Sequence, residues 1–350
     1  MTGWASLQES LLARNVPLHA LYEVTERCNY ACPHCYLPHR GDGELTTDEA
    51  KRLVDDLAAA GTMFLTLSGG EPFLRRDFPE IALHAREREF ALRIFTNGWF
   101  VDDARADFLA ALCPMAVEIS LYGPDPETFE AVTQVPGSFE RTRDAIARLA
   151  SRGVRTLAKT PALSTNARRI PEIAALARDL GAEFRFDALV APMDGGETPP
   201  LALRPSDDDL AHVFRWEARE AGGHVPEAKP LDAAPCNAGR GAVAISPRGD
   251  VFPCVAIKVP AGNVRERAFG EIWRHGPILE RVRSITVGSL RECATCEDRP
   301  WCPRCAGVAM WEHGSLEAPS LEACRIAAER RAAHEGRAAR HRSNALRIVE

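Results

Sequence analysis

The sequence predicts an α/β fold built around a parallel sheet, followed by a cysteine-rich region. Between residue 17 and about residue 220, short apolar runs of strand length alternate with amphipathic segments of helix length. Parallel strands need crossover connections, and this alternation supplies a helix for each of them. Seven cysteines gather between residues 236 and 324, whereas the stretch before them contains few. We therefore expect an α/β domain and, after it, a separate metal-binding domain.

Six strands and their connecting helices are expected in the first region. The strands are predicted at residues 18–24, 63–67, 90–95, 116–121, 154–159 and 183–189. The first helix begins at a capping box, Thr46-Thr-Asp-Glu49, and Gly61 is its expected C-cap. The other helices are predicted at residues 77–88, 102–112, 139–151, 171–180 and 206–221.

Composition narrows the class of protein. The chain has 350 residues, of which 45% are hydrophobic and 26% are charged, as in ordinary globular proteins. Its net charge of −6 argues against general nucleic-acid affinity. No apolar run approaches the roughly 20 residues of a membrane span, and residues 1–16 lack a secretory signal pattern. We expect a cytoplasmic protein without nucleic-acid or membrane partners, whose 11 cysteines are metal ligands rather than disulfides.

Three cysteines directly follow the first predicted strand. Cys28, Cys32 and Cys35 are spaced C-x3-C-x2-C. Iron–sulfur clusters normally take four cysteines, so three thiolates would leave one iron of a four-iron cluster without a protein ligand. In catalytic zinc centres, an open metal position of this kind is where the chemistry takes place. A structural zinc knuckle formed by the three cysteines and His34 is the alternative interpretation.

With Tyr36 directly after the last cysteine, this segment resembles the signature of radical S-adenosylmethionine (radical SAM) enzymes. The resemblance implies a partial (β/α)6 TIM-like barrel with a [4Fe-4S] cluster on Cys28, Cys32 and Cys35. SAM would chelate the unique iron, and reduction by the cluster would yield methionine and a 5′-deoxyadenosyl radical that abstracts hydrogen from a substrate. Tyr36 would lie near the adenine.

Polar residues at the ends of the next strands fit a SAM site, because ligands bind at the carboxyl ends of parallel strands. The second strand ends in Gly69, Gly70 and Glu71, and glycines allow close backbone approach. By the resemblance, these three residues bind the amino group of SAM. Asn97 and Ser120 resemble family segments that line the SAM site, although Asn-Gly and Tyr-Gly-Pro are also common turn sequences.

Two residues outside these motifs have simpler interpretations. Lys159 ends the fifth predicted strand and either meets a carboxylate or is solvated. Cys113 ends an Ala/Leu-rich helix before Pro114 and is expected to be a buried structural thiol.

The carboxyl-terminal cysteines resemble the SPASM extension of radical SAM peptide-maturing enzymes, which usually holds two auxiliary [4Fe-4S] clusters. Their order, the glycine five residues before Cys254 and the helix start at Phe269-Gly-Glu-Ile-Trp273 support the resemblance. It assigns the distal cluster to Cys293, Cys296, Cys302 and Cys324. It assigns the proximal cluster to Cys236, Cys254 and Cys305.

This array departs from the family pattern in two ways. Two residues separate Cys302 from Cys305, where the family usually has three, and the shortening changes the reach of Cys305. Seven cysteines also supply only seven of eight ligands, so the proximal cluster has an open iron, a non-cysteine ligand or a smaller core. A zinc ribbon with knuckles at Cys293/Cys296 and Cys302/Cys305 is the alternative, although their linker is short for one.

Four segments are expected along the chain. They are an amino-terminal extension (residues 1–16), a radical SAM core (17–225), a SPASM domain (232–325) and an Arg/Ala-rich carboxyl-terminal helix (326–350). The helical pattern runs from Arg325 to Arg342, and we expect a solvated helix rather than one that docks an acidic partner.

The resemblance implies an enzyme similar to the maturases of the pyrroloquinoline quinone and mycofactocin type. Such an enzyme modifies a ribosomally made peptide by a crosslink, thioether, decarboxylation or epimerisation. Its expected partners are the precursor peptide and an external electron donor of the flavodoxin or ferredoxin type. The 16 or so residues before the first strand are too few for a recognition domain, so a separate small peptide-recognition protein is also expected.

Two other functions are weighed against this one. The first is a tetrapyrrole-modifying enzyme of haem or haem d1 synthesis, where similar cysteine arrays occur. No basic cluster suited to a polycarboxylate macrocycle is evident near the predicted barrel mouth, which lowers this hypothesis. The second is a zinc-stabilised binding protein without catalysis.

Overall fold

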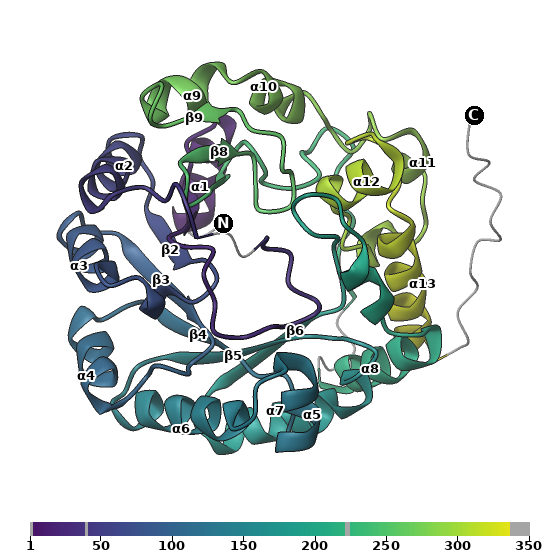
Figure 1. Cartoon of the computed structure of the whole chain (residues 1–350). Helices are drawn as coiled ribbons and strands as arrows, with labels where there is room; N and C mark the ends of the chain where they lie inside the picture. Colours follow the sequence, from purple (N-terminus) through teal and green to yellow (C-terminus); the bar gives the residue numbers. More distant parts are fainter. Residues whose placement is uncertain (1–2, 39–40, 221–224, 337–350) are drawn as a thin grey trace.

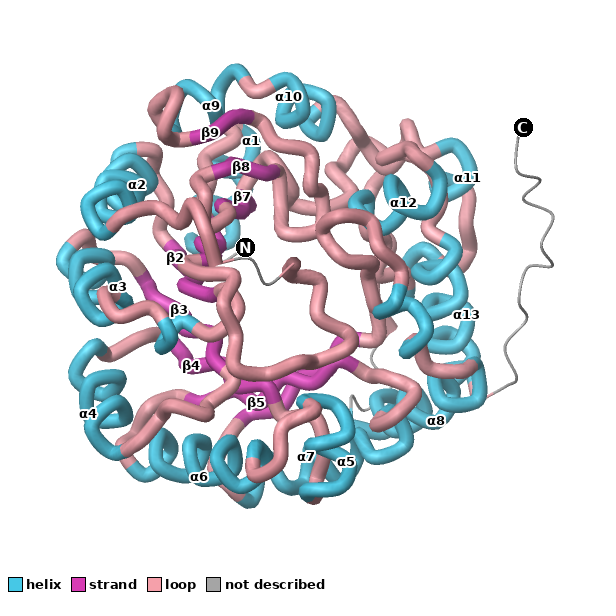
Figure 2. Tube along the Cα trace, in the orientation of Figure 1, coloured by secondary structure: helices cyan, strands magenta, loops and turns pink. Residues whose placement is uncertain are grey.

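A computed structural model describes residues 3–38, 41–220 and 225–336 of the chain (Figure 1). Six strands pair side by side in parallel, in chain order, as the sequence predicts. They are β1 (His19–Glu23), β2 (Phe64–Ser68), β3 (Ala91–Thr96), β4 (Ala116–Ser120), β5 (Thr156–Pro161) and β6 (Glu183–Asp187). The sheet curves around a central space, and the helices that connect its strands lie on its outer side (Figures 1 and 2).

The predicted helices are present within a few residues of their expected bounds. They are α2 (Thr47–Ala59), α3 (Phe78–Glu87), α4 (Asp103–Leu112), α6 (Ser138–Ser151), α7 (Ile170–Asp179) and α8 (Asp207–Glu220). The capping box of α2 is confirmed, since the Thr46 hydroxyl accepts from the Glu49 amide and the Glu49 carboxylate accepts from the Thr46 amide. Two further helices, α1 (Gly3–Ala13) and α5 (Pro126–Thr133), were not predicted.

Strand burial shows which face of the sheet points inward. On β6, Phe184 and Phe186 pack against the aromatic side chains of α8. Their neighbours Glu183, Arg185 and Asp187 are exposed and point to the opposite face, because side chains alternate along a strand. That face borders the central space, so the barrel interior is polar and accessible along β6.

Three more strands extend the sheet beyond the predicted six. They are β7 (Ala242–Ile245), β8 (Asp250–Phe252) and β9 (Gly262–Asn263). The strand order is β6-β5-β4-β3-β2-β1-β7-β8-β9, with β7 parallel to β1 and the last two pairs antiparallel. One nine-stranded sheet therefore continues from the core into the cysteine-rich region (Figure 2).

The cysteine-rich region is built from short helices and loops. Its helices are α9 (Phe269–His275), α10 (Pro277–Arg283), α11 (Arg291–Ala294), α12 (Ala306–His313) and α13 (Leu321–Glu335). The described residues also form four short 3-10 helices: η1 (Pro72–Leu74), η2 (Ala167–Arg169), η3 (Pro199–Leu203) and η4 (Arg299–Trp301).

Within the described residues the carboxyl-terminal helix is not solvated, so the prediction was wrong for this part of the segment. Helix α13 packs along α8 and buries Ala323, Ile326 and Ala327 (Figure 1). Ion pairs such as Arg330–Glu217, at 2.9 Å, flank the contact. The alanines that suggested a solvated helix instead allow close helix packing. The expected boundary after residue 325 falls inside α13, and residues 337–350 lie outside the described chain.

Cys113 is exposed, which corrects the expectation of a buried thiol. It is the C-cap of α4 and adopts a left-handed conformation with φ of 50°. The preceding Leu112 is the last buried residue of the helix. The chain turns away from the core at Cys113, and its thiol turns with it.

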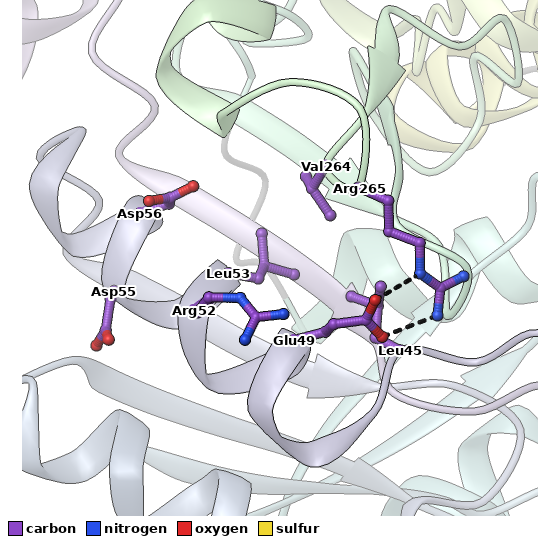
Figure 3. A pocket seen from close by; sticks show the side chains of 8 residues that line it. All are labelled: Leu45, Glu49, Arg52, Leu53, Asp55, Asp56, Val264 and Arg265. Atoms are coloured by element: carbon purple, nitrogen blue, oxygen red, sulfur yellow. Dashed lines mark hydrogen bonds and ion pairs between the residues drawn. The ribbon is translucent and has the colours of Figure 1, made fainter.

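A hollow of about 540 Å³ lies on the outer side of the barrel, between α2 and the loop that follows β9 (Figure 3). Arg265 and Glu49 both line it, and the Arg265 guanidinium donates two hydrogen bonds of 2.9 Å to the Glu49 carboxylate. None of the residues that line the hollow is a cysteine or a predicted SAM contact. It therefore lies where α2 of the first region meets the loop after β9 of the cysteine-rich region, and it is separate from the site described below.

No helix within the described residues is long and apolar enough to span a membrane.

Candidate iron–sulfur and SAM site

The first three cysteines lie in a loop that begins directly after β1, at the carboxyl edge of the sheet. The Cys35 amide donates to the Cys32 carbonyl at 3.0 Å, and the Tyr30 amide donates to the Cys28 sulfur at 3.4 Å. Burial raises the pKa of Cys32 to about 12, and the neighbouring Cys35 and Cys28 thiols add to the rise. The structure thus brings the three predicted ligands together in a shielded loop, where binding a metal requires them to lose protons.

No site for a single metal ion is assembled at this loop within the described residues. Among the described residues, no three His, Cys, Asp or Glu side chains are placed to hold one ion. The His34 ring makes an edge contact with Tyr122, with ring centroids 5.1 Å apart. A zinc knuckle needs its ligands to converge on one ion, whereas a four-iron cluster needs each thiolate on a different iron.

The Gly-Gly-Glu segment is fastened to the start of the cysteine loop. The Gly70 amide donates to the Thr25 carbonyl, and the Glu71 amide donates to the Arg27 carbonyl, both at 2.8 Å. A Cβ on Gly70 would lie 2.2 Å from the Arg27 carbonyl oxygen, and one on Gly69 would lie 2.3 Å from that of Thr25. Only glycine permits this approach, which fixes the segment against the residues preceding Cys28.

The Glu71 carboxylate is fully buried and is used within the protein. It accepts from the Thr96 hydroxyl at 2.9 Å, from the Asn97 amide at 2.8 Å and from the Phe73 amide at 3.2 Å. Burial raises the pKa of Glu71 to about 7, against the opposing effect of these hydrogen bonds. The carboxylate thereby connects the ends of β2 and β3, and its expected contact with an ammonium group stays a prediction.

The other predicted SAM contacts lie on strands beside the cysteine loop. The Asn97 side-chain amide follows β3 and donates to Asn29 Oδ1 at 2.8 Å, with the Cys28 sulfur 3.8 Å away. Ser120 ends β4 and lies near the Tyr122 hydroxyl, which in turn lies near the Cys32 thiol. The structure thus places Asn97 and Ser120 at the same edge as the three thiols.

Lys159 meets a carboxylate, as one of its two interpretations allowed. Its ammonium lies 2.9 Å from the buried Glu118 carboxylate and 4.0 Å from the centroid of the Phe95 ring. Arg93 pairs with the same carboxylate at 3.5 Å. These groups lie on the strand face that carries Arg185, so several basic side chains border the barrel interior.

Tyr36 joins a group of charged residues that the sequence analysis missed. Its hydroxyl donates to Glu23 at 2.7 Å, and its carbonyl accepts from the Asp194 amide at 2.8 Å. Lys258 reaches the group from the cysteine-rich region and pairs with Asp194 at 2.9 Å. Burial raises the pKa values of Glu23 and Asp194, although Lys258 opposes both shifts. Glu23 could have been found from its position at the end of a predicted strand. Asp194 and Lys258 lie in loops without a motif.

The auxiliary cysteines form the two groups that the resemblance assigned. Burial raises the pKa of Cys302 to about 12, and the nearby thiols of Cys324, Cys293 and Cys296 add to the rise. Burial likewise raises the pKa of Cys254 to about 12, and the nearby thiols of Cys305 and Cys236 add to the rise. The grouping agrees with the predicted distal and proximal sets, and their role as cluster ligands stays a prediction.

The short spacing between Cys302 and Cys305 is compensated by close backbone packing. Gly307 lies at the start of α12, and a Cβ there would be 2.1 Å from the Ala256 carbonyl oxygen. Ala256 belongs to the turn after Cys254, whose carbonyl accepts from the Ile257 amide. The contact brings the start of α12 onto this turn and so places Cys305 beside Cys254.

We predict that Gly307→Ala disrupts the proximal set. The added methyl meets backbone atoms that cannot move aside, so α12 must shift away from the turn after Cys254. Iron content should fall by about one cluster, or about four irons per chain. Gly270→Ala is the matched control, because the nearest atom to its Cβ is 3.8 Å away. Iron analysis of the two anoxic proteins decides, and equal iron contents would contradict the packing argument.

Comparisons with known proteins agree with this geometry. Sequence models match the radical SAM superfamily over residues 22–177 and the SPASM iron–sulfur cluster-binding domain over residues 236–306. A PqqA peptide cyclase of Xanthomonas oryzae pv. oryzae is 31% identical, and the alignment covers 92% of both chains. The chain belongs to the radical SAM superfamily and carries a SPASM domain. An AdoMet-dependent heme synthase of Methanosarcina barkeri is 29% identical over 84% of this chain and 93% of its own.

Solved structures share the fold of this radical SAM enzyme. Streptococcus suis SuiB bound to S-adenosylmethionine superposes with a TM-score of 0.72 at 17% identity, over 90% of this chain and 81% of SuiB. The peptide-bound anSMEcpe, which also holds AdoMet, gives 0.67 at 16% identity, over 89% and 95%. The likeness confirms the TIM-like partial barrel followed by a SPASM domain.

The residues present fit the cofactors of this family, which are SAM and [4Fe-4S] clusters. Soft thiolates suit iron–sulfur clusters, and the three cysteine groups supply them at separate places. Within the described residues, the Asn29 side-chain nitrogen next to Cys28 is buried without a hydrogen-bond partner. It can therefore donate a hydrogen bond to a group bound beside the thiols. Because the chain belongs to this family, iron–sulfur clusters rather than zinc ions are the expected metal groups.

Proposed function

We propose that this radical SAM enzyme modifies a ribosomally synthesised precursor peptide by a crosslink, thioether, decarboxylation or epimerisation. The observation that carries the proposal is the 31% identity to PqqA peptide cyclase over 92% of both chains. The auxiliary cysteine groups support it, because they provide two further sites for clusters near the barrel. A structural neighbour, SuiB, is known with a bound precursor peptide.

The cofactors, when bound, supply a carbon radical that removes a hydrogen atom from the substrate. The chain's own residues bind these cofactors and orient them toward the substrate. We propose that the thiolates of Cys28, Cys32 and Cys35 hold the SAM cluster. The SAM contacts that we propose at this edge of the sheet are Tyr36, Gly69, Gly70, Glu71, Asn97 and Ser120.

The polar interior along β6 is the proposed substrate side of the barrel. Glu183, Arg185 and Asp187 are exposed there and point away from α8. They lie on the strand at the far end of the six from β1, where the cysteine loop begins. A peptide segment that enters on this side would reach the SAM site while the helices close the outer face.

The test is anoxic co-expression with each short peptide encoded beside the gene, followed by mass spectrometry. A crosslink or thioether removes two hydrogens from the peptide, and decarboxylation that begins with hydrogen abstraction removes carbon dioxide and two hydrogens. Epimerisation leaves the mass unchanged but incorporates one solvent deuterium in heavy water. Peptides that leave the enzyme unmodified, although SAM is cleaved in their absence, would overturn the peptide proposal.

We further propose a separate peptide-recognition protein, a flavodoxin- or ferredoxin-type electron donor and a cytoplasmic location. The recognition protein can be tested alone by titrating the isolated enzyme with the leader segment of its peptide. Weak binding that tightens when a small neighbouring gene product is added is the expected result. Tight binding by the isolated enzyme would contradict it.

Tetrapyrrole modification is the second candidate, and two observations favour it. The AdoMet-dependent heme synthase is similar over 93% of its length, and basic side chains do border the barrel interior. Arg93, Lys159 and Arg185 suit the carboxylates of such a ring. Incubation with a propionate-bearing tetrapyrrole decides, because loss of carbon dioxide from the ring, with no change in any peptide, would select this function.

A further inference from the structure

A buried charged group connects the loop of the SAM cluster to the SPASM domain. We name it the Lys258 group, and its members are Glu23, Tyr36, Asp194 and Lys258. Lys258 follows the turn after Cys254, and Tyr36 directly follows Cys35. Glu23 is at the carboxyl end of β1, where the cysteine loop begins. The group therefore lies between segments that carry ligands of two predicted clusters.

The Lys258 ammonium is enclosed on several sides. Its side chain is 7% exposed, and it lies 2.9 Å from Asp194 and 3.8 Å from Glu23. The rings of Tyr36 and Phe252 each have their centroid 5.3 Å from the nitrogen. Such a charge acts more strongly on its surroundings than a solvated one, because little water screens it.

Stability alone gives a poor account of this arrangement. Burying an ion pair removes charges from water, and the cost often equals or exceeds the attraction gained. An apolar contact between Tyr36 and the SPASM domain would connect the two parts at least as well. The group holds two carboxylates against one ammonium, so Lys258 offsets negative charge close to the cysteine loop. Both carboxylates are within electrostatic range of the Cys35 thiol.

We propose that Lys258 is a positioning residue that sets the electrostatic potential at the Cys28/Cys32/Cys35 cluster. Reduction of an iron–sulfur cluster adds negative charge, so a nearby fixed cation favours the reduced form and a nearby carboxylate disfavours it. Lys258 thereby raises the reduction potential against the opposing effect of Asp194 and Glu23. The inference concerns the cluster rather than the substrate, and it holds whichever molecule the enzyme modifies.

The test compares variants of opposite charge effect in the anoxic holoenzyme. Lys258→Met removes the cation at similar volume, Asp194→Asn removes an anion and keeps its main-chain bond to Tyr36, and Lys258→Arg retains the charge. The potential is measured by redox titration followed by electron paramagnetic resonance. The cluster is identified as the one whose signal changes shape when SAM is added.

The expected shifts have opposite signs. Lys258→Met lowers the midpoint potential, Asp194→Asn raises it, and Lys258→Arg stays close to the wild type. Arg265→Met is the matched control, because it removes an ion pair to Glu49 that also joins the two parts of the chain but lies on the outer side of the barrel. Its midpoint potential should not change.

Two results would overturn the proposal. One is an unchanged potential in Lys258→Met with full iron content. The other is a shift of the same sign in Lys258→Met and Asp194→Asn, which indicates loosened packing rather than an effect of charge. If Lys258→Met fails to retain iron, Asp194→Asn and Lys258→Arg decide the matter, because both preserve hydrogen-bonding groups at their positions.

Discussion

Replacing Cys28 and Cys32 together by alanine is expected to abolish 5′-deoxyadenosine formation from SAM under anoxic, reducing conditions. One remaining thiolate, on Cys35, cannot hold a four-iron cluster, because such clusters normally need at least three protein ligands to stay in place. The reaction starts at that cluster, so no part of the activity survives its loss. Chromatographic quantification of 5′-deoxyadenosine and iron analysis measure the two consequences, and about four irons per chain should disappear.

Cys113→Ala is the control for this variant. Cys113 is exposed at the end of α4, and it belongs to none of the three cysteine groups that the structure brings together. Its replacement should leave both the iron content and the rate unchanged. Turnover at the wild-type level in Cys28→Ala/Cys32→Ala would refute the assignment of the cluster loop and the account of the reaction with it.

Local signals explain why much of the fold is predictable from the sequence. The six parallel strands are short apolar runs, and the Thr46/Glu49 capping box predicts the start of α2. The strands β7 to β9 escaped because they have two to four residues each, too few for a periodic pattern. Their place in the sheet depends on the pairing of β7 with β1, which joins residues over 200 positions apart.

Helix α13 shows how composition misleads when the partner surface is unknown. Its arginines and alanines have almost no apolar periodicity, which is typical of a solvated helix. In the structure, Arg325 pairs with Glu322 and Asp207, and Arg330 pairs with Glu217. These arginines thus form ion pairs with acidic residues of α8 and of α13 itself. Nothing in the sequence of α13 indicates that Asp207 and Glu217 of α8 lie opposite it.

The candidate site likewise contains residues whose positions can be predicted from the sequence and residues whose positions cannot. The cysteines and the Gly-Gly-Glu segment follow strands whose carboxyl ends share one edge, so their proximity could be inferred before the structure. The contributions of Asp194, Lys258 and Gly307 could not. Each acts through a loop contact with a distant segment, and a lone Asp, Lys or Gly in a loop has no distinguishing pattern.

Gly70→Ala is expected to damage the SAM site almost as severely as loss of a ligand. The new Cβ would lie 2.2 Å from the Arg27 carbonyl oxygen and 2.8 Å from that of Glu26. Both are backbone atoms directly before Cys28, so the cysteine loop itself has to move. We expect at least a tenfold loss of 5′-deoxyadenosine formation, together with a loss of stability of about 1–3 kcal/mol typical of overpacking.

The control for Gly70→Ala is Gly3→Ala, because a Cβ at that position meets nothing within 4 Å. The conformation of Gly70 is not left-handed, so any effect of its methyl group is steric rather than conformational. Electron paramagnetic resonance with and without SAM separates the possible causes. A cluster that is present but does not respond to SAM indicates a displaced Gly-Gly-Glu segment, whereas a missing cluster indicates a displaced loop. Wild-type iron, SAM response and rate in Gly70→Ala would show that the close approach to Arg27 is not needed, and the role proposed for this glycine would then fail.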